Sequence, residues 1–404
     1  MNYRSLLIVS GLFHLFVGLR LVCGLDGHLA GQAVLAVSLL LSALLLPLGL
    51  SGGRMGSFVV PKVWKDRASW LGFLLMGYFS SMLVLTLMRD FGLIVLWLFE
   101  LAASATLPWA AIHAFSVLAV LTLALLVTVA GLLNARRTAA VVRIDIPIKS
   151  LPKVLHGFTL VQISDLHVGA TIKNSYVQRI VERVNTLNAD MVAVTGDLVD
   201  GTVSDLRQHV APLGAMQSRH GTFFVTGNHE YYSGAHAWID ELRRIGWTVL
   251  INEHVVLHHG PAGPAGAAFQ ADAQDDSLVM APLVLAGVTD YTAHHFDAQH
   301  QSDPQLALAG SPQTAAVRLL LAHQPRSAAA AAEAGFDLQV SGHTHGGQFF
   351  PWNLFVRFQQ PYLAGLNRIG DMWVYTSRGT GYWGPPKRFL APSEISVLRL
   401  VAGN

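Results

Sequence analysis

Four long apolar runs in the first third of the chain constrain its architecture more than any other feature. They cover Leu6 to Gly24, Gly31 to Leu50, Trp70 to Met88, and Trp109 to Leu133. Each approaches or exceeds the roughly 18 apolar residues that a helix needs to cross the core of a bilayer. Charged residues make up only 13% of the whole chain, where soluble domains carry about 25%. The sequence therefore predicts a membrane domain of about four spanning helices over residues 1–134.

Basic residues beside these runs predict the orientation of the helices. With four spans, three groups of basic residues fall on one side of the membrane: Arg4, then Arg54, Lys62, Lys65 and Arg67, and finally Arg136, Arg137 and Arg143. The positive-inside rule makes that side cytoplasmic. We therefore expect an integral protein of the inner or plasma membrane, with the rest of the chain in the cytoplasm.

A shorter apolar run, Phe91 to Phe99, leaves the number of spans open. It lies between Asp90 and Glu100 and is too short to span alone, so an interfacial or re-entrant segment is expected, with a fifth span as the alternative. Arg20 is the single charge inside the four long runs, and we expect it to snorkel from near a helix end. Without paired charges in the spans, an anchor or a lipid-facing platform is favoured over a transporter.

Beyond residue 134 the pattern changes to that of an α/β domain. Residues 135–157 form a linker and a first strand, in which Val142, Ile144, Ile146 and Ile148 alternate with more polar positions. In residues 158–404, short apolar runs alternate with helical patterns, as expected for layers of strands and helices. The runs are Phe158–Ile163, Met191–Val194, Thr222–Val225, Leu283–Ala286, Val317–Leu321, Leu338–Val340 and Met372–Tyr375. The stretch from Gly260 to Asp276 is rich in Gly, Ala and Pro and predicts a surface insertion.

Five polar motifs directly follow predicted strands. They are Asp165-Leu166-His167, Gly196-Asp197, Gly227-Asn228-His229-Glu230, the single His323, and Gly342-His343-Thr344-His345. Because ligands bind beyond the carboxyl ends of strands in α/β sheets, the five loops can converge on one site. The alternative, that these are only turn and capping residues, explains single motifs but not the ordered set.

The residue types in these motifs favour a divalent metal site. Asp, Asn and His offer oxygen and nitrogen ligands that suit Mn, Fe, Zn, Co or Ni. The chain has one cysteine, Cys23, so a thiolate site or a disulfide framework within one chain is excluded. A net charge of +2 without a Lys/Arg run gives no indication of nucleic acid as a partner, and no protein partner is indicated.

This ordered set resembles the signature of the calcineurin-like metallophosphoesterase superfamily. The segments Gln162 to His167, Gly342 to Gln348, and Ser377-Arg378-Gly379 resemble more narrowly the YaeI and YkuE type of bacterial phosphodiesterase. The multi-span N-terminus is also similar to transmembrane proteins with a metallophosphoesterase domain. The resemblance implies two packed β-sheets flanked by helices.

The resemblance also implies a role for each motif residue. Asp165, His167 and His345 would hold a first metal ion, Asn228, His323 and His343 a second, and Asp197 would bridge them, with His229 beside the metals as the catalytic residue. Such an ion pair can lower the pKa of a bridging water, so that hydroxide attacks the phosphorus in line with the leaving group. The expected activity is hydrolysis of a phosphodiester or pyrophosphate. The alternatives are a phosphomonoesterase and a catalytically idle metal-binding scaffold at the membrane.

Several other residues are candidates for roles near such a site. Arg378 lies in a glycine-rich loop and is a candidate for binding the substrate phosphate, with a structural salt bridge as the equal alternative. Glu230 is expected to form local hydrogen bonds. An aromatic cluster after the last motif either packs in the core or forms an apolar apron at the site mouth. An apron that faces the bilayer would suit a lipid-linked substrate. The cluster consists of Phe349, Phe350, Trp352 and Phe355. Most remaining histidines are expected to be solvated: His209, His220, His236, His254, His258, His259, His294 and His295.

Overall fold

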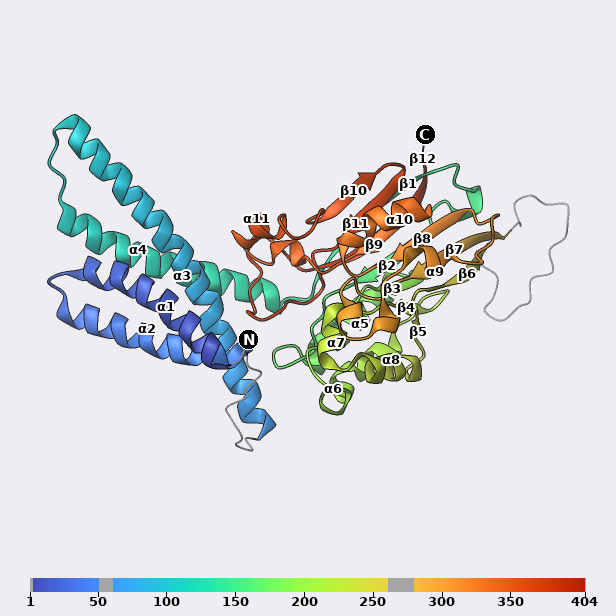
Figure 1. Cartoon of the computed structure of the whole chain (residues 1–404), viewed down its shortest axis with the longest axis horizontal. Helices are drawn as coiled ribbons and strands as arrows, with labels where there is room; N and C mark the ends of the chain where they lie inside the picture. Colours follow the sequence, from blue (N-terminus) through green and yellow to red (C-terminus); the bar gives the residue numbers. More distant parts are fainter. Residues whose placement is uncertain (1–2, 51–60, 261–279, 404) are drawn as a thin grey trace. The chain divides into compact units, whose positions relative to one another are not determined.

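The chain folds into two compact units in a computed structural model that describes residues 3–50, 61–260 and 280–403. The first unit is Met1–Arg136 together with Gly384–Phe389, and the second is Arg137–Trp383 together with Leu390–Asn404 (Figure 1). The chain therefore passes between the units after residues 136, 383 and 389. Most of the predicted insertion from Gly260 to Asp276 lies outside the described residues.

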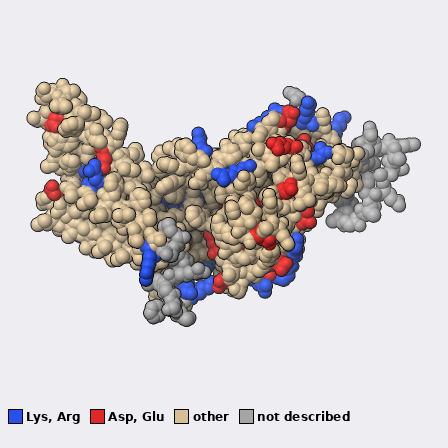
Figure 2. All heavy atoms as spheres, in the orientation of Figure 1, with Lys and Arg blue, Asp and Glu red and all other residues tan. Residues whose placement is uncertain are grey.

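The first unit consists mainly of long apolar helices. These are α1 (Tyr3–Val22), α2 (Leu29–Leu50), α3 (Lys62–Ala103) and α4 (Trp109–Arg136), with the short helix η1 (Cys23–Leu25) after α1. All four are long and apolar enough to cross a membrane, as expected for a multi-span helical domain. Their visible surface carries few charged side chains (Figure 2). Leu12, Leu40 and Phe115 are exposed, as expected for side chains that face lipid, while Val17, Phe79 and similar residues form a core between the helices.

The prediction of a separate interfacial or re-entrant piece at Phe91 to Phe99 is wrong, because this segment continues α3. The helix is 42 residues long, or about 63 Å at 1.5 Å per residue. The Arg89 and Asp90 charges do not end it because they are paired. Asp90 Oδ2 accepts a hydrogen bond from Nε of Arg20 at 2.7 Å, and its Oδ1 lies 3.2 Å from Nη1 of Arg89.

Arg20 is thus ion-paired to α3, which corrects the expectation that it only snorkels. The premise that the spans hold no paired charges is also wrong. The group joins three helices, because Arg89 also donates to Ser116 Oγ of α4 at 2.8 Å. These charged side chains line a cavity of about 540 Å³ beside η1. The cavity lies near the C-terminal end of α1 and the N-terminal end of α4.

The segment Gly384–Phe389 packs between α3 and α4. Nζ of Lys387 donates to the Gly77 carbonyl at 2.8 Å and to the hydroxyls of Ser81 and Thr128. The backbone N–H of Arg388 donates to the Gly131 carbonyl at 2.9 Å. Lys387 is 1% exposed and Arg388 is fully buried. The first unit therefore includes six residues that composition places in the α/β domain.

The second unit contains two mixed six-stranded sheets. One has the order β1-β12-β2-β3-β4-β5 and the other β10-β11-β9-β8-β7-β6. The strands are β1 (Ala140–Lys149), β2 (Thr159–Ile163), β3 (Met191–Val194), β4 (Thr222–Phe224), β5 (Thr248–Val249), β6 (Glu253–His259), β7 (Ala281–Gly287), β8 (Val317–Leu321), β9 (Leu338–Ser341), β10 (Gly365–Ile369), β11 (Met372–Thr376) and β12 (Glu394–Gly403). β2 to β5 run parallel, as do β7, β8, β9 and β11.

The main core of this unit lies between the two sheets. Leu160 and Phe223 of the first sheet meet Leu283, Leu319 and Val340 of the second in one buried cluster. A second buried cluster packs the helices α9 (Pro304–Leu308) and α10 (Ala328–Ala334) against the second sheet, on the face that points away from the first sheet. The remaining helices are α5 (Asn174–Asn185), α6 (Val203–Val210), α7 (Asn228–Ser233), α8 (Ala235–Arg244) and α11 (Trp352–Val356). This is the expected α/β fold of two packed sheets with flanking helices.

Candidate metal centre

The five predicted motifs lie in loops that leave both sheets at the carboxyl ends of their parallel strands. The first three follow β2, β3 and β4, and the last two follow β8 and β9. Five motif residues have left-handed backbone conformations, with φ between 51° and 70°: Asp165, His167, Asp197, His343 and His345. Such a conformation in a non-glycine residue costs about 1–3 kcal/mol and is typical of functional sites. The backbone of these loops therefore adopts an unfavourable conformation that places the side chains in the site, and this lowers the stability of the fold.

Glycines allow the loops to approach one another closely. A Cβ atom at Gly342 would overlap the Oγ of Ser164 and the Oδ2 of Asp165, and one at Gly227 would overlap Asp197. Asp165 accepts hydrogen bonds from the backbone N–H of His343 at 3.0 and 3.1 Å. A side chain at Gly342 would therefore separate the β2 loop from the β9 loop.

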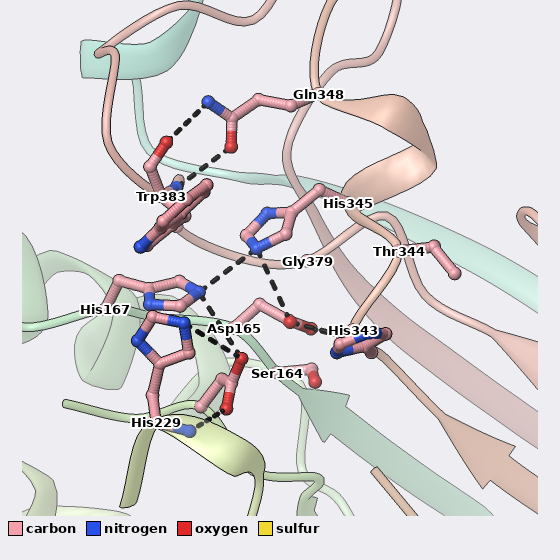
Figure 3. A network of polar contacts seen from close by, with 12 residues as sticks. Ser164, Asp165, His167, His229, His343, Thr344, His345, Gln348, Gly379 and Trp383 are labelled. Atoms are coloured by element: carbon pink, nitrogen blue, oxygen red, sulfur yellow. Dashed lines mark hydrogen bonds and ion pairs between the residues drawn. The ribbon is translucent and has the colours of Figure 1, made fainter. Parts of the chain in front are cut away.

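Asp165, His167 and His345 form the first group of potential ligands. The Nε2 atoms of His167 and His345 face each other at 3.1 Å, and His345 Nε2 lies 3.5 Å from Asp165 Oδ1 (Figure 3). Two ligands bound to one ion at 2.0–2.1 Å are separated by about 2.9–3.4 Å. The facing nitrogens therefore have the spacing of neighbouring ligands on a single metal ion.

His323 and His343 form the second group, and Asn228, the third predicted ligand of this group, begins α7 directly before His229. His323 Nε2 lies 3.1 Å from His343 Nδ1, again two ring nitrogens that face each other. Asn228 is buried, and its Oδ1 has no hydrogen-bond partner among the residues that the structure describes. Because a buried amide oxygen is rarely left unpaired, this atom fits the role of a metal ligand.

Asp197 lies between the two groups. Its Oδ2 is 3.2 Å from His323 Nε2 of the second group and 3.8 Å from His167 Nε2 of the first. Its Oδ1 accepts the backbone N–H of His229 at 2.9 Å, which fixes the carboxylate. The structure thus brings six of the seven predicted ligands and His229 into one site, and the seventh, Asn228, is the residue before His229 in α7.

The polar groups behind the histidines also suit a metal centre. His323 Nδ1 lies 2.7 Å from the Thr195 carbonyl, and His167 Nδ1 lies 2.9 Å from Asp200 Oδ1. A ligating histidine commonly donates its second ring N–H to such an oxygen, which leaves the other nitrogen for the ion. Burial, with a contribution from His323, lowers the pKa of His343 to about 3, so its ring is neutral near pH 7. The donor set therefore fits divalent ions.

Asp200 is a site residue that the motif search missed. Its Oδ1 lies 2.9 Å from His167 Nδ1 and 2.7 Å from His229 Nδ1, so one carboxylate orients a predicted ligand and the predicted catalytic residue. Burial would raise the pKa of Asp200, but the two imidazoles hold it well below its usual value. The signal in the sequence is its position three residues after Asp197, in the same loop.

His229 lies at the edge of the centre. Its Nε2 is 4.0 Å from Asp197 Oδ2, and its ring is flanked by Tyr232 and Trp383, at centroid distances of 5.1 and 5.8 Å. Burial lowers the pKa of His229, but Asp197 and Asp200 outweigh it and raise the value to about 9. The imidazole can therefore carry a proton at neutral pH.

Glu230 forms local hydrogen bonds, as predicted. Its carboxylate accepts the backbone N–H groups of Asp197 at 3.0 Å, Leu198 at 2.8 Å and Gly227 at 2.7 Å. It is fully buried beneath the metal loops. Glu230 therefore connects the start of α7 to the β3 loop that carries Asp197.

Arg378 forms the salt bridge that was the alternative to substrate binding. Its Nη1 lies 3.1 Å from Glu394 Oε2, and its side chain is 40% exposed. The aromatic cluster is divided: Phe349 is buried, whereas Phe350, Trp352 and Phe355 are between 40% and 55% exposed. Three of its four rings are thus not core residues and remain available for an apolar surface beside the site.

Comparisons with known proteins agree with this geometry. Residues 158–347 match the family described as calcineurin-like phosphoesterase. A "transmembrane protein with metallophosphoesterase domain" from Danio rerio is 38% identical over 69% of this chain and 62% of its own length. An uncharacterized metallophosphoesterase of Campylobacter jejuni is 32% identical over 70% of this chain and 69% of its own length.

The metallophosphoesterase YkuE of Bacillus subtilis is 27% identical over 63% of this chain and 82% of its own length. The chain spans about 60% of the length of the first vertebrate relatives, from Danio rerio and Bos taurus. These matches show that the chain belongs to the calcineurin-like metallophosphoesterase family.

Proposed function

We propose that this protein is a membrane-anchored hydrolase that cleaves phosphodiester or pyrophosphate bonds with two divalent metal ions. One observation carries the proposal: Asp197 Oδ2 lies within 4 Å of a histidine from each ligand group. A carboxylate in this position can be shared by two ions. The first ion would be held by Asp165, His167 and His345, the second by Asn228, His323 and His343, and Asp197 would bridge them.

When bound, such an ion pair supplies a water of near-neutral pKa as nucleophile and neutralises the charge on the phosphate oxygens. The protein's own residues set the geometry for this chemistry. Asp197 is held by the His229 N–H and, through its own N–H, by Glu230. Asn228 adds a ligand without charge, so the site keeps fewer negative charges to repel a phosphate.

His229 is proposed to donate a proton to the leaving oxygen. Its Nδ1 is held by Asp200 at 2.7 Å, which leaves Nε2 on the side that faces Asp197. An imidazole with this orientation and a raised pKa suits the role of general acid. The flanking rings of Tyr232 and Trp383 are 62% and 45% exposed and can contact an apolar leaving group.

A lipid-linked substrate is proposed on the basis of the exposed aromatic residues of the second unit. Phe350, Trp352 and Phe355 follow the His343-Thr344-His345 loop directly and offer an apolar surface next to it. The test is turnover by the full-length protein of a lipid-linked phosphodiester and of a soluble diester with the same leaving group. Equal kcat/KM values for the two substrates would contradict lipid recognition without affecting the proposed hydrolysis.

The proposed hydrolysis is tested on the full-length protein purified in detergent. Metal content is measured by mass spectrometry, and turnover is measured with an aryl phosphodiester and the corresponding aryl phosphomonoester. We expect at least two ions per chain, two of which depend on the catalytic centre, and a preference for the diester. Asp197→Asn should lose ions and turnover together, whereas Asp371→Asn, at a fully exposed carboxyl in the β10–β11 turn, should keep both.

The outcomes separate the alternatives. A preference for the monoester would make the protein a phosphomonoesterase. Two bound ions with no turnover of any ester would favour the idle metal-binding scaffold. A wild-type protein that binds no ions after reconstitution would contradict the binuclear centre itself.

A further inference from the structure

A second cluster of metal-ligating side chains lies outside the centre described above. It consists of His236 near the start of α8, Asp297, and His300 at the end of the short helix η6 (Ala298–His300). Asp297 Oδ2 lies 2.9 Å from His236 Nε2 and 3.9 Å from His300 Nε2. Both imidazoles therefore direct Nε2 at the same carboxylate oxygen.

Two other polar atoms of the cluster have partners of their own. His300 Nδ1 lies 2.7 Å from the hydroxyl of Tyr231, and Asp297 Oδ1 accepts the backbone N–H of Gln299 at 2.9 Å. When Nδ1 of His300 donates to Tyr231, its Nε2 keeps a lone pair directed at Asp297. This arrangement, with the outer nitrogen held by a hydroxyl and the inner one left for an ion, is typical of ligating histidines.

The cluster is open on one side. The side chain of His236 is 72% exposed, that of Asp297 25% and that of His300 12%. An ion can enter from solvent on the His236 side, and water can complete its coordination. Two imidazoles and one carboxylate are a donor set that zinc and similar divalent transition ions prefer over Ca²⁺ or Mg²⁺.

We propose that His236, Asp297 and His300 bind one divalent transition-metal ion, in addition to those of the catalytic centre. The site would join α8 to the turn that contains Asp297 and His300. Tyr231, which contacts His300, belongs to α7, the helix that also carries Asn228 and His229. Occupancy would therefore stabilise the packing around α7, and the role is structural.

The test uses the full-length protein, stripped with a chelator and titrated with Zn²⁺. We expect wild type to bind one ion more than His236→Ala, or to bind that ion at least about tenfold more tightly. The same comparison with Co²⁺ should show a visible absorption band that the variant lacks. His295→Ala, a nearby exposed histidine outside the cluster, should match wild type.

Further variants make the test decisive. Because His236 is largely exposed, His236→Ala should melt at the wild-type temperature without metal, and Zn²⁺ should raise the melting temperature of wild type more than that of the variant. Asp197→Asn should retain this ion while losing those of the catalytic centre, so the two sites fail independently. Equal ion numbers and equal affinities in wild type and in a His236→Ala, His300→Ala double variant would overturn the proposal.

Discussion

At the residue scale, Asp200 controls the centre without being a predicted ligand. One oxygen holds Nδ1 of both His167 and His229. We predict that Asp200→Asn lowers kcat/KM by about 10–100-fold, the usual effect of losing a group that orients a ligand. Metal content should fall less than turnover, because the seven ligands remain. The control is Asp205→Asn, in the first turn of α6, and equal activity of Asp200→Asn and wild type would contradict the orienting role.

His229→Ala separates proton transfer from metal binding. We predict a loss of about 10²–10⁴-fold in kcat with unchanged ion content, because His229 is the only residue of the eight assigned no metal. Mass spectrometry of the purified variant, next to its turnover of an aryl diester, checks this. If the ions are lost as well, His229 is a ligand and the assignment fails.

The sequence predicted the potential metal ligands, but it did not predict the residues that hydrogen-bond to them and orient them. Asp165, His167, Asp197 and the other motif residues each follow a buried strand, and strand ends converge regardless of how distant they are in the chain. Asp200 was not predicted because its partners, His167 and His229, lie in two other loops. No local sequence pattern indicates that these three residues are in contact. The pairing of His236 with Asp297 is hidden for the same reason.

At the element scale, the polar group at Asp90 joins α1 to α3, and Arg89 connects both to α4. We predict that Asp90→Asn lowers the stability of the full-length protein by about 1.5–3 kcal/mol, the range for hydrogen bonds to charged groups, because two guanidinium groups lose their shared carboxylate. Thermal melting in detergent measures this. The control is Asp26→Asn at an exposed aspartate of the α1–α2 connection, and equal melting of Asp90→Asn and wild type would show that the pair contributes little.

Whole elements were predicted where the pattern is local. β3 and β8 match their predicted ranges, because short buried runs are bounded by turns. β12 was not predicted, since it pairs parallel with β1, more than 200 residues earlier, and that register is set by tertiary packing. α3 was predicted too short because the charges at its Arg89 and Asp90 look like a helix end until Arg20 is seen beside them.

At the scale of the whole molecule, labelling of the one cysteine can show which side of the membrane each part of the chain faces. Cys23 is exposed and lies in η1 between α1 and α2. If Arg4 and the other basic groups face the cytoplasm, a membrane-impermeant maleimide should label Cys23 on intact cells. A chain with Cys23→Ser and His156→Cys should be labelled only after permeabilisation, because His156 is an exposed residue of the second unit. The reverse pattern would place the catalytic domain outside.

The six residues Gly384–Phe389 impose an order on biosynthesis. The helices end at Arg136, 248 residues before Gly384, so at about 5–20 residues per second they precede that segment by roughly 10–50 s. Before that segment is made, the Gly77 carbonyl and the Ser81 hydroxyl lack the hydrogen bonds that Lys387 donates to them. A chain stopped at residue 383 should therefore have a bundle that proteases cut faster than in the complete chain. The helical bundle therefore gains the segment between α3 and α4 only after the ribosome has passed most of the α/β domain.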